Sequence, residues 1–138
     1  MALLLQQNCN DKALNKNMIK NLAPDIFRQR LLIESFYTID ISRETVEKYL
    51  LDIAENLSLR TYGKPVIFAP TSSMGQEKNA GYDAFIPLID SGISAYFWSN
   101  AKFFSIVIYT CKGFDEQAAI DFTREYFAVS SEIASASF

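Results

Sequence analysis

Two small side chains with nucleophilic groups, Ser91 and Cys111, lie at the two ends of the most strand-forming stretch of the sequence. The residues between them are rich in β-branched and aromatic types and are interrupted only by a short polar turn over 99–102. In an antiparallel hairpin, the outer ends of the two strands lie side by side. The sequence therefore predicts that a serine and a cysteine come together at one end of a hairpin, where they could serve one reaction.

The chain contains no histidine, and this absence limits the chemistry open to such a pair. Ser-His triads, Cys-His dyads and most zinc sites need an imidazole and are excluded within one chain. The two cysteines, Cys9 and Cys111, fit no metal-ligand spacing and predict no disulfide. Unpaired cysteines favour a reducing, cytoplasmic compartment.

The charge and hydropathy of the sequence also limit which kinds of partner the protein is expected to bind. A net charge of −3 with mixed signs gives no basic patch for nucleic acid. The opening Met-Ala-Leu-Leu-Leu is too short for a signal peptide, and no apolar run is long enough to cross a membrane. We therefore expect neither nucleic acid nor a membrane as a partner.

The length of 138 residues fits one domain over residues 28–138, preceded by a polar leader over 1–27 that we expect to be flexible. Apolar periodicity predicts strands over residues 30–37, 66–69 and 82–89 in addition to the hairpin. Helices are expected to begin at Asp40 or Ser42 and at Asp115. A last short strand is expected over 129–133, followed by a frayed Ser-Ala-Ser tail.

This order of elements predicts an α+β fold, a two-layer sandwich in which a mostly antiparallel sheet carries two helices on one face. Aromatic residues are frequent on the strands, so the other sheet face needs a cover. A second copy of the same sheet would provide it, and we expect a homodimer. The polar stretch 71–80 is either a binding loop or a plain surface excursion.

The central stretch reads Asp90-Ser-Gly-Ile-Ser-Ala-Tyr-Phe-Trp98-Ser-Asn, and Thr-Cys111 follows after nine more residues. It resembles the core of the prokaryotic S-adenosylmethionine decarboxylases. In that family the segment reads Glu-Ser-His-x-Ser-x-His-Thr-Trp-Pro-Glu, and a Thr-Cys pair follows at the same distance. The similarity extends more weakly from Leu31 to Phe127.

Members of this family cut their own backbone before the serine and convert that serine into a pyruvoyl group, whose ketone withdraws electrons from the bound substrate so that carbon dioxide can leave. The resemblance implies a cut between Asp90 and Ser91, with Cys111 as the acid that returns a proton to the product carbon. It also implies S-adenosylmethionine or a related small molecule as ligand, a role in spermidine synthesis, and a homodimer. Trp98 matches the family tryptophan.

The sequence departs from the family pattern at several positions. Tyr96 stands where the family has its processing histidine, Asp83 where it has a serine that assists, and Gly92 where a second histidine lies. Tyrosine has an unperturbed pKa near 10 and is a poor base at neutral pH, so we expect Asp83 to take a proton during processing. Asn100 replaces the glutamate that holds the ribose and would bind it more weakly. Glu77, in the polar loop, could substitute for that carboxylate.

These departures leave three functional classes open, all with the same fold. The chain could be a self-processing S-adenosylmethionine decarboxylase. It could be a divergent enzyme that stays uncut or acts on another amino-acid-like substrate. It could instead be a non-catalytic relative that binds a nucleoside ligand or regulates an active homologue in a heterodimer.

Overall fold

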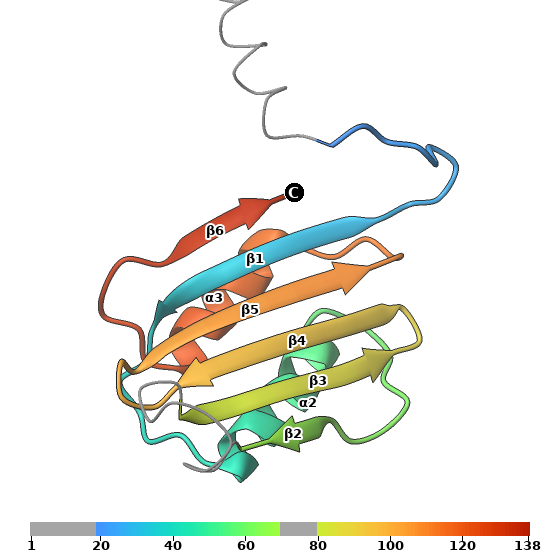
Figure 1. Ribbon diagram of the computed structural model, residues 1–138. Helices are drawn as coiled ribbons and strands as arrows, with labels where there is room; N and C mark the ends of the chain where they lie inside the picture. The colour runs from blue at the N-terminus through green and yellow to red at the C-terminus, as the bar shows by residue number, and fades with distance from the viewer. Residues whose placement is uncertain (1–18, 70–79) are drawn as a thin grey trace, which may run out of the picture.

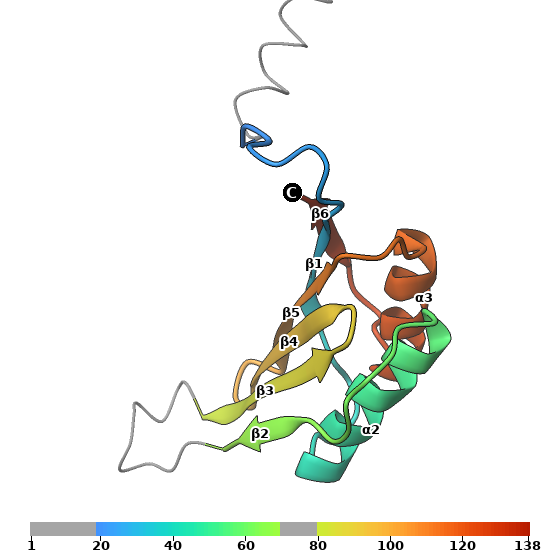
Figure 2. The same ribbon diagram turned by 90° about the vertical axis from the view of Figure 1, so that its right-hand side faces the viewer.

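The computed structural model describes residues 19–69 and 80–138. Along the chain the elements are β1 (Gln29–Phe36), α2 (Arg43–Asn56), β2 (Val66–Phe68), β3 (Gly81–Leu88), β4 (Ser91–Trp98), β5 (Phe103–Thr110), α3 (Glu116–Tyr126) and β6 (Ala134–Ser137). Within these described residues the strands form one antiparallel sheet in the order β2-β3-β4-β5-β1-β6 (Figure 1). Both helices lie on the same side of this sheet, as the edge-on view in Figure 2 shows. The predicted two-layer α+β sandwich is confirmed.

Side-chain caps fix where the two helices begin. The Ser42 hydroxyl accepts a hydrogen bond from the Thr45 N–H at 3.2 Å, and the Asp115 carboxylate accepts one from the Ala118 N–H at 3.0 Å. Each cap satisfies a backbone donor that the first helical turn leaves without a partner. Of the two predicted starts for the first helix, Ser42 is the cap.

The sheet face that meets the helices holds the hydrophobic core. Alternate residues of the central strands point to this face, and Ile33, Ile86, Ile93, Ile106 and Ile108 are fully buried there. From the helix side, Tyr49, Leu50, Ile53 and Phe127 complete the core.

The opposite face of the sheet, which we call the open face, carries the other half of each strand's side chains. No helix of the described chain covers it (Figure 2). Several of its large apolar side chains are substantially exposed, among them Phe68 at 65%, Phe36 at 50% and Phe85 at 44%. Contiguous exposed apolar side chains of this kind are typical of interaction surfaces.

The last strand is not where the sequence placed it. Residues 129–133 form no strand, and the expectation of a frayed tail is also wrong, because β6 occupies Ala134–Ser137 and pairs with β1. All four residues of β6 are exposed, so no apolar alternation marked them. Their pairing rests on the backbone groups that the edge of β1 offers.

Pro87 lies inside β3, where the sequence predicted an edge or a break. Of the described strands, β2 pairs with β3 only over Asp83–Phe85. At Pro87, β3 has passed the end of β2, and its outer neighbour is the irregular segment before β2. Thr61 forms an isolated bridge with Leu88, and the Tyr62 N–H donates to the Pro87 carbonyl at 3.5 Å. No regular strand of the described chain pairs with β3 on this side at Pro87, so a residue without an N–H donor is tolerated.

Candidate active site

The hairpin brings Ser91 and Cys111 to the same end of the sheet. Ser91 is the cross-strand partner of Thr110, the residue before Cys111. The Cys111 N–H donates a hydrogen bond of 2.9 Å to the carbonyl oxygen of Asp90. This carbonyl belongs to the Asp90–Ser91 peptide bond, so the bond of interest accepts a backbone donor from the cysteine at the other end of the hairpin. Cys111 itself is an exposed free thiol.

Ser91 has an unusual backbone conformation. Its φ is 122°, in a region that side-chain-bearing residues rarely adopt. Ser91 directly follows the tight turn over Ile89 and Asp90, which joins Leu88 to its partner Ser91. A non-glycine residue held in this way costs about 1–3 kcal/mol. Backbone strain is therefore stored at the residue that follows the Asp90–Ser91 bond.

Asp90 is anchored by Arg60, a residue that no sequence motif marks. The Arg60 Nη2 donates to Asp90 Oδ1 at 2.9 Å, and the Arg60 backbone N–H donates to Oδ2 at 3.0 Å. The Asp90 side chain is only 4% exposed. The hydrogen bonds from Arg60 hold the pKa of the Asp90 carboxyl below its ordinary value, so this carboxylate stays ionised. Arg60 thus fixes the Asp90 side chain, and the Cys111 N–H fixes the carbonyl oxygen of the Asp90–Ser91 peptide bond.

Asp83 and Tyr96 are direct cross-strand partners on the open face. The structure brings these two together and places both far from Ser91 of the same chain. Tyr96 lies five residues along β4 from Ser91, a separation of roughly 16 Å at the rise of a strand. Neither side chain can exchange a proton with Ser91 within one protomer.

The predicted ligand-binding residues lie at the far end of the hairpin. Trp98 ends β4, and its ring centroid is 5.4 Å from that of Phe103. Asn100 is exposed in the turn between β4 and β5. Glu77 lies outside the described residues. In one protomer, therefore, Trp98 and Asn100 are near Tyr96 rather than near Ser91.

Next to Ser91, Gly92 makes room for an aromatic ring. A Cβ atom built at Gly92 would lie 2.6 Å from Cε2 of Phe85, closer than any real contact. The ring of Phe85 thus covers the backbone of Gly92. In the family that the sequence resembles, a histidine stands at this position. A side chain at residue 92 would require Phe85 to move.

Two features are absent from residues 19–69 and 80–138: a metal-ligand cluster and a membrane-spanning helix. No cluster of three or more potential metal-ligating side chains occurs in these ranges. Neither described helix is long and apolar enough to pass through a lipid bilayer.

Comparison with known proteins identifies the family of this chain. The fold resembles the crystal structure of the adenosylmethionine decarboxylase from Aquifex aeolicus VF5, with a TM-score of 0.62 and 18% sequence identity, over 82% of this chain and 89% of that one. No curated protein matches the sequence significantly. The sequence profile of S-adenosylmethionine decarboxylase matches residues 33–136. This match includes every element from the body of β1 to β6, and the chain belongs to the S-adenosylmethionine decarboxylase family.

Proposed function

We propose that this protein is a pyruvoyl-dependent carboxy-lyase of the S-adenosylmethionine decarboxylase type, with Ser91 as the precursor of the pyruvoyl group. The observation that carries the proposal is the state of the Asp90–Ser91 peptide unit. Its carbonyl accepts the Cys111 N–H at 2.9 Å, and Ser91 is held at a φ of 122°. Both features favour rearrangement of this bond over its neighbours.

The first step of processing would use the chain's own atoms. The Ser91 Oγ attacks the Asp90 carbonyl carbon, and negative charge develops on the carbonyl oxygen that already accepts the Cys111 N–H. The C–N bond then breaks, which leaves an ester on Oγ and a free amine on Ser91. Because the peptide bond is gone, the strain at Ser91 is released.

The second step would remove the Ser91 Cα proton and break the Cβ–Oγ bond, which releases the Asp90 carboxylate as a new C-terminus. Water then replaces the nitrogen, which leaves as ammonia, and a pyruvoyl group remains. This group supplies the electron-withdrawing ketone for loss of carbon dioxide from an amino-acid substrate. The Cys111 thiol, at the same end of the hairpin, is suited to return a proton to the product carbon.

The base for these steps would come from a second copy. Asp83 and Tyr96 lie roughly 16 Å from Ser91 in their own chain, too far for proton transfer. Both are on the open face, whose exposed aromatic residues support a homodimer that pairs two such faces. In that dimer, the Asp83–Tyr96 pair of one chain would serve Ser91 of the other. Trp98 and Asn100 would reach the ligand from the same direction.

Denaturing intact-mass measurement tests the proposal directly. Processing predicts two fragments that meet at Asp90/Ser91, with the C-terminal fragment blocked by pyruvoyl. A single species of 15.6 kDa, stable on incubation, would contradict pyruvoyl chemistry. Decarboxylation of S-adenosylmethionine would then identify the substrate, and a cut chain without that activity would indicate another amino-acid-like substrate. The sequence predicts no disulfide, and this supports the cytoplasm as the compartment in which the protein works.

Two observations favour a second candidate, a non-catalytic relative. The Phe85 ring fills the space above Gly92 beside Ser91, and the sequence has no histidine to assist cleavage. Such a protein would bind a nucleoside ligand or regulate an active homologue in a heterodimer. Calorimetry with S-adenosylmethionine separates a ligand-binding relative from an empty scaffold, and co-purification of a histidine-containing homologue would favour the regulatory role.

A further inference from the structure

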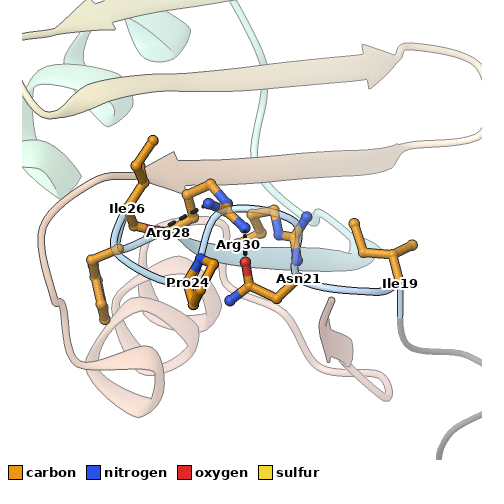
Figure 3. Close-up of a pocket in the computed structure, with 7 residues that line it drawn as sticks. Ile19, Asn21, Pro24, Ile26, Arg28 and Arg30 are labelled. Carbon is orange, nitrogen blue, oxygen red and sulfur yellow. Dashed lines mark hydrogen bonds between the residues drawn. The ribbon is translucent and has the colours of Figure 1, made fainter.

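A cavity of about 250 Å³ lies between the segment that precedes β1 and the start of that strand (Figure 3). Its walls include apolar side chains of the segment, such as Ile26, but its charged lining consists of two arginines, Arg28 and Arg30. Figure 3 shows both guanidinium groups beside the Asn21 side chain. The chemistry proposed above uses none of these residues.

Arg30 has a buried donor without an acceptor. Its Nε is inaccessible to solvent and makes no hydrogen bond within the described chain. Its guanidinium lies over the ring of Phe138, with Cζ 5.3 Å from the ring centroid, a contact that stabilises the positive charge but accepts no N–H in the plane of the group. Buried donors in native proteins nearly always have an acceptor, so the Arg30 side chain is incompletely satisfied. Nε is closed to water, so a group in the cavity would meet the Nη atoms of Arg30, which lines the cavity, rather than Nε itself.

Arg28 is held in place by neutral acceptors. Its Nη1 donates to the carbonyl oxygens of Ala23 at 3.0 Å and Ile26 at 2.9 Å, and its Nη2 donates to Asn21 Oδ1 at 2.7 Å. These bonds fix the guanidinium without cancelling its charge. Among residues 19–69 and 80–138, neither Arg28 nor Arg30 forms an ion pair with a carboxylate. Two cationic groups thus share one cavity with no described counter-charge.

We propose that this cavity is an oxyanion site that takes a phosphate or carboxylate group. Guanidinium forks match the geometry of both groups. The volume is below that of pockets for drug-sized ligands, which run from about 300 to 1,000 Å³, so it suits one acid group with water rather than a whole nucleoside.

The oxyanion site is separate from the candidate active site. Arg30 pairs with Tyr109, and Tyr109 pairs with Gly92, so two strand spacings, roughly 10 Å, separate Arg30 from β4. The cavity shares no lining residue with the group formed by Arg60, Asp90, Ser91 and Cys111. The proposal goes beyond the proposed function and does not depend on cleavage of the chain.

Nuclear magnetic resonance of arginine side chains tests this on the full chain. The Nε–Hε signal of Arg30, assigned by its loss in Arg30→Gln, is followed while inorganic phosphate, sodium acetate or sodium chloride is added at matched ionic strength. We expect a saturable shift with phosphate or acetate and none with chloride. Saturation with phosphate alone assigns a phosphate-class ligand, and saturation with acetate alone a carboxylate. A shift that only follows ionic strength, in all three titrations, overturns the proposal.

Calorimetric titration of variants with the saturating anion provides the second arm. Arg30→Gln should weaken binding by about tenfold or more, because a charged donor is lost. Arg124→Gln, on α3 and distant in the fold, is the matched control and should bind as the unaltered chain does. Equal affinity in the Arg30 variant, with its circular dichroism unchanged, would contradict the assignment.

Discussion

Ser91 begins β4 at a φ of 122°, and this strain has a measurable consequence for stability. Two variants that cannot be cut, Ser91→Ala and Ser91→Gly, differ mainly in how well residue 91 tolerates that conformation. Glycine accepts it freely, so Ser91→Gly should be more stable than Ser91→Ala by about 1 kcal/mol or more in urea unfolding.

Ser94, in a regular part of β4, is the matched control for this comparison. There the order of the two variants should reverse, because glycine in a strand interior loses entropy without relieving strain, at a cost of about 0.5–1 kcal/mol. If glycine were the less stable variant at position 91 as well, the strain argument would be wrong.

Arg60 should make stability depend on pH through Asp90. The pKa of the Asp90 carboxyl is lowered in the folded state from its ordinary 3.8, so the folded state binds this proton less readily than the unfolded chain does. The resulting stability is present above pH 3.8 and is lost as the pH falls through the lower, folded value. Arg60→Gln should therefore lower the melting temperature most at neutral pH, and the difference from the unaltered chain should shrink in acid.

Lys48→Gln is the control for this titration. It removes an exposed ion pair between Lys48 and Asp52 on α2, and exposed pairs contribute little. A pH-independent effect of Arg60→Gln, or one no larger than that of the control, would show that the Asp90 contact is not what stabilises the turn.

The sequence predicted the residues of this site better than it predicted their conformations. Ser91 and Cys111 could be brought together because a hairpin with a short turn permits little else. Arg60 could not be found, because it lies thirty residues before Asp90, in an irregular stretch with no periodic pattern. The φ of Ser91 was equally hidden, since serine is not a residue that signals such a conformation.

At the scale of elements, a buried hydrogen bond contributes to the packing of α2 against α3. The Tyr49 hydroxyl lies 2.8 Å from Thr123 Oγ1, and Thr123 donates its own proton to the Ala119 carbonyl, so Tyr49 is the donor. Burial raises the pKa of Tyr49, which keeps the hydroxyl protonated. Tyr49→Phe should destabilise the fold by about 1 kcal/mol in urea unfolding.

Tyr126→Phe is a useful comparison for this helix contact. Its hydroxyl donates to the Thr45 carbonyl at 2.8 Å from a partly exposed position, where water can replace it. The cost there should be smaller. Equal costs for the two variants would indicate that the buried Tyr49–Thr123 bond contributes no more than a surface one.

Sequence patterns predicted the elements that build the core, and also the short, largely exposed strand β2, whose residues are apolar. Both helices and the central strands have capped or alternating patterns set by one core, and these were identified. β6 was not, because its Ala-Ser repeat buries nothing and is held by backbone pairing to β1 alone. An edge strand of this kind has no side-chain signal to read.

For the whole molecule, the open face predicts the oligomeric state. Phe68 projects from β2 with 65% of its surface exposed, and Phe68→Asp should weaken a dimer that buries this face. Tyr62→Asp is the matched control, since Tyr62 is 72% exposed but lies in the loop before β2. Sedimentation velocity should show a dimer for the unaltered chain and for the control, and a larger monomer fraction for Phe68→Asp. A monomer in all three would contradict the proposed dimer.

The separation of Ser91 from the Asp83–Tyr96 pair leads to the most demanding prediction. If the pair of one chain serves Ser91 of the other, two defective chains can restore one complete site. Asp83→Asn alone should stay uncut, and Ser91→Ala alone cannot be cut. When the two are co-expressed, a mixed dimer places an intact Asp83 against an intact Ser91, so the Asp83→Asn chain should now be cleaved, as intact mass would show. Asp83→Asn co-expressed with a differently tagged copy of itself is the control and should remain whole. Rapid cleavage of Asp83→Asn on its own would exclude Asp83 as the base, whereas no cleavage in the mixture would place the missing group outside this dimer arrangement.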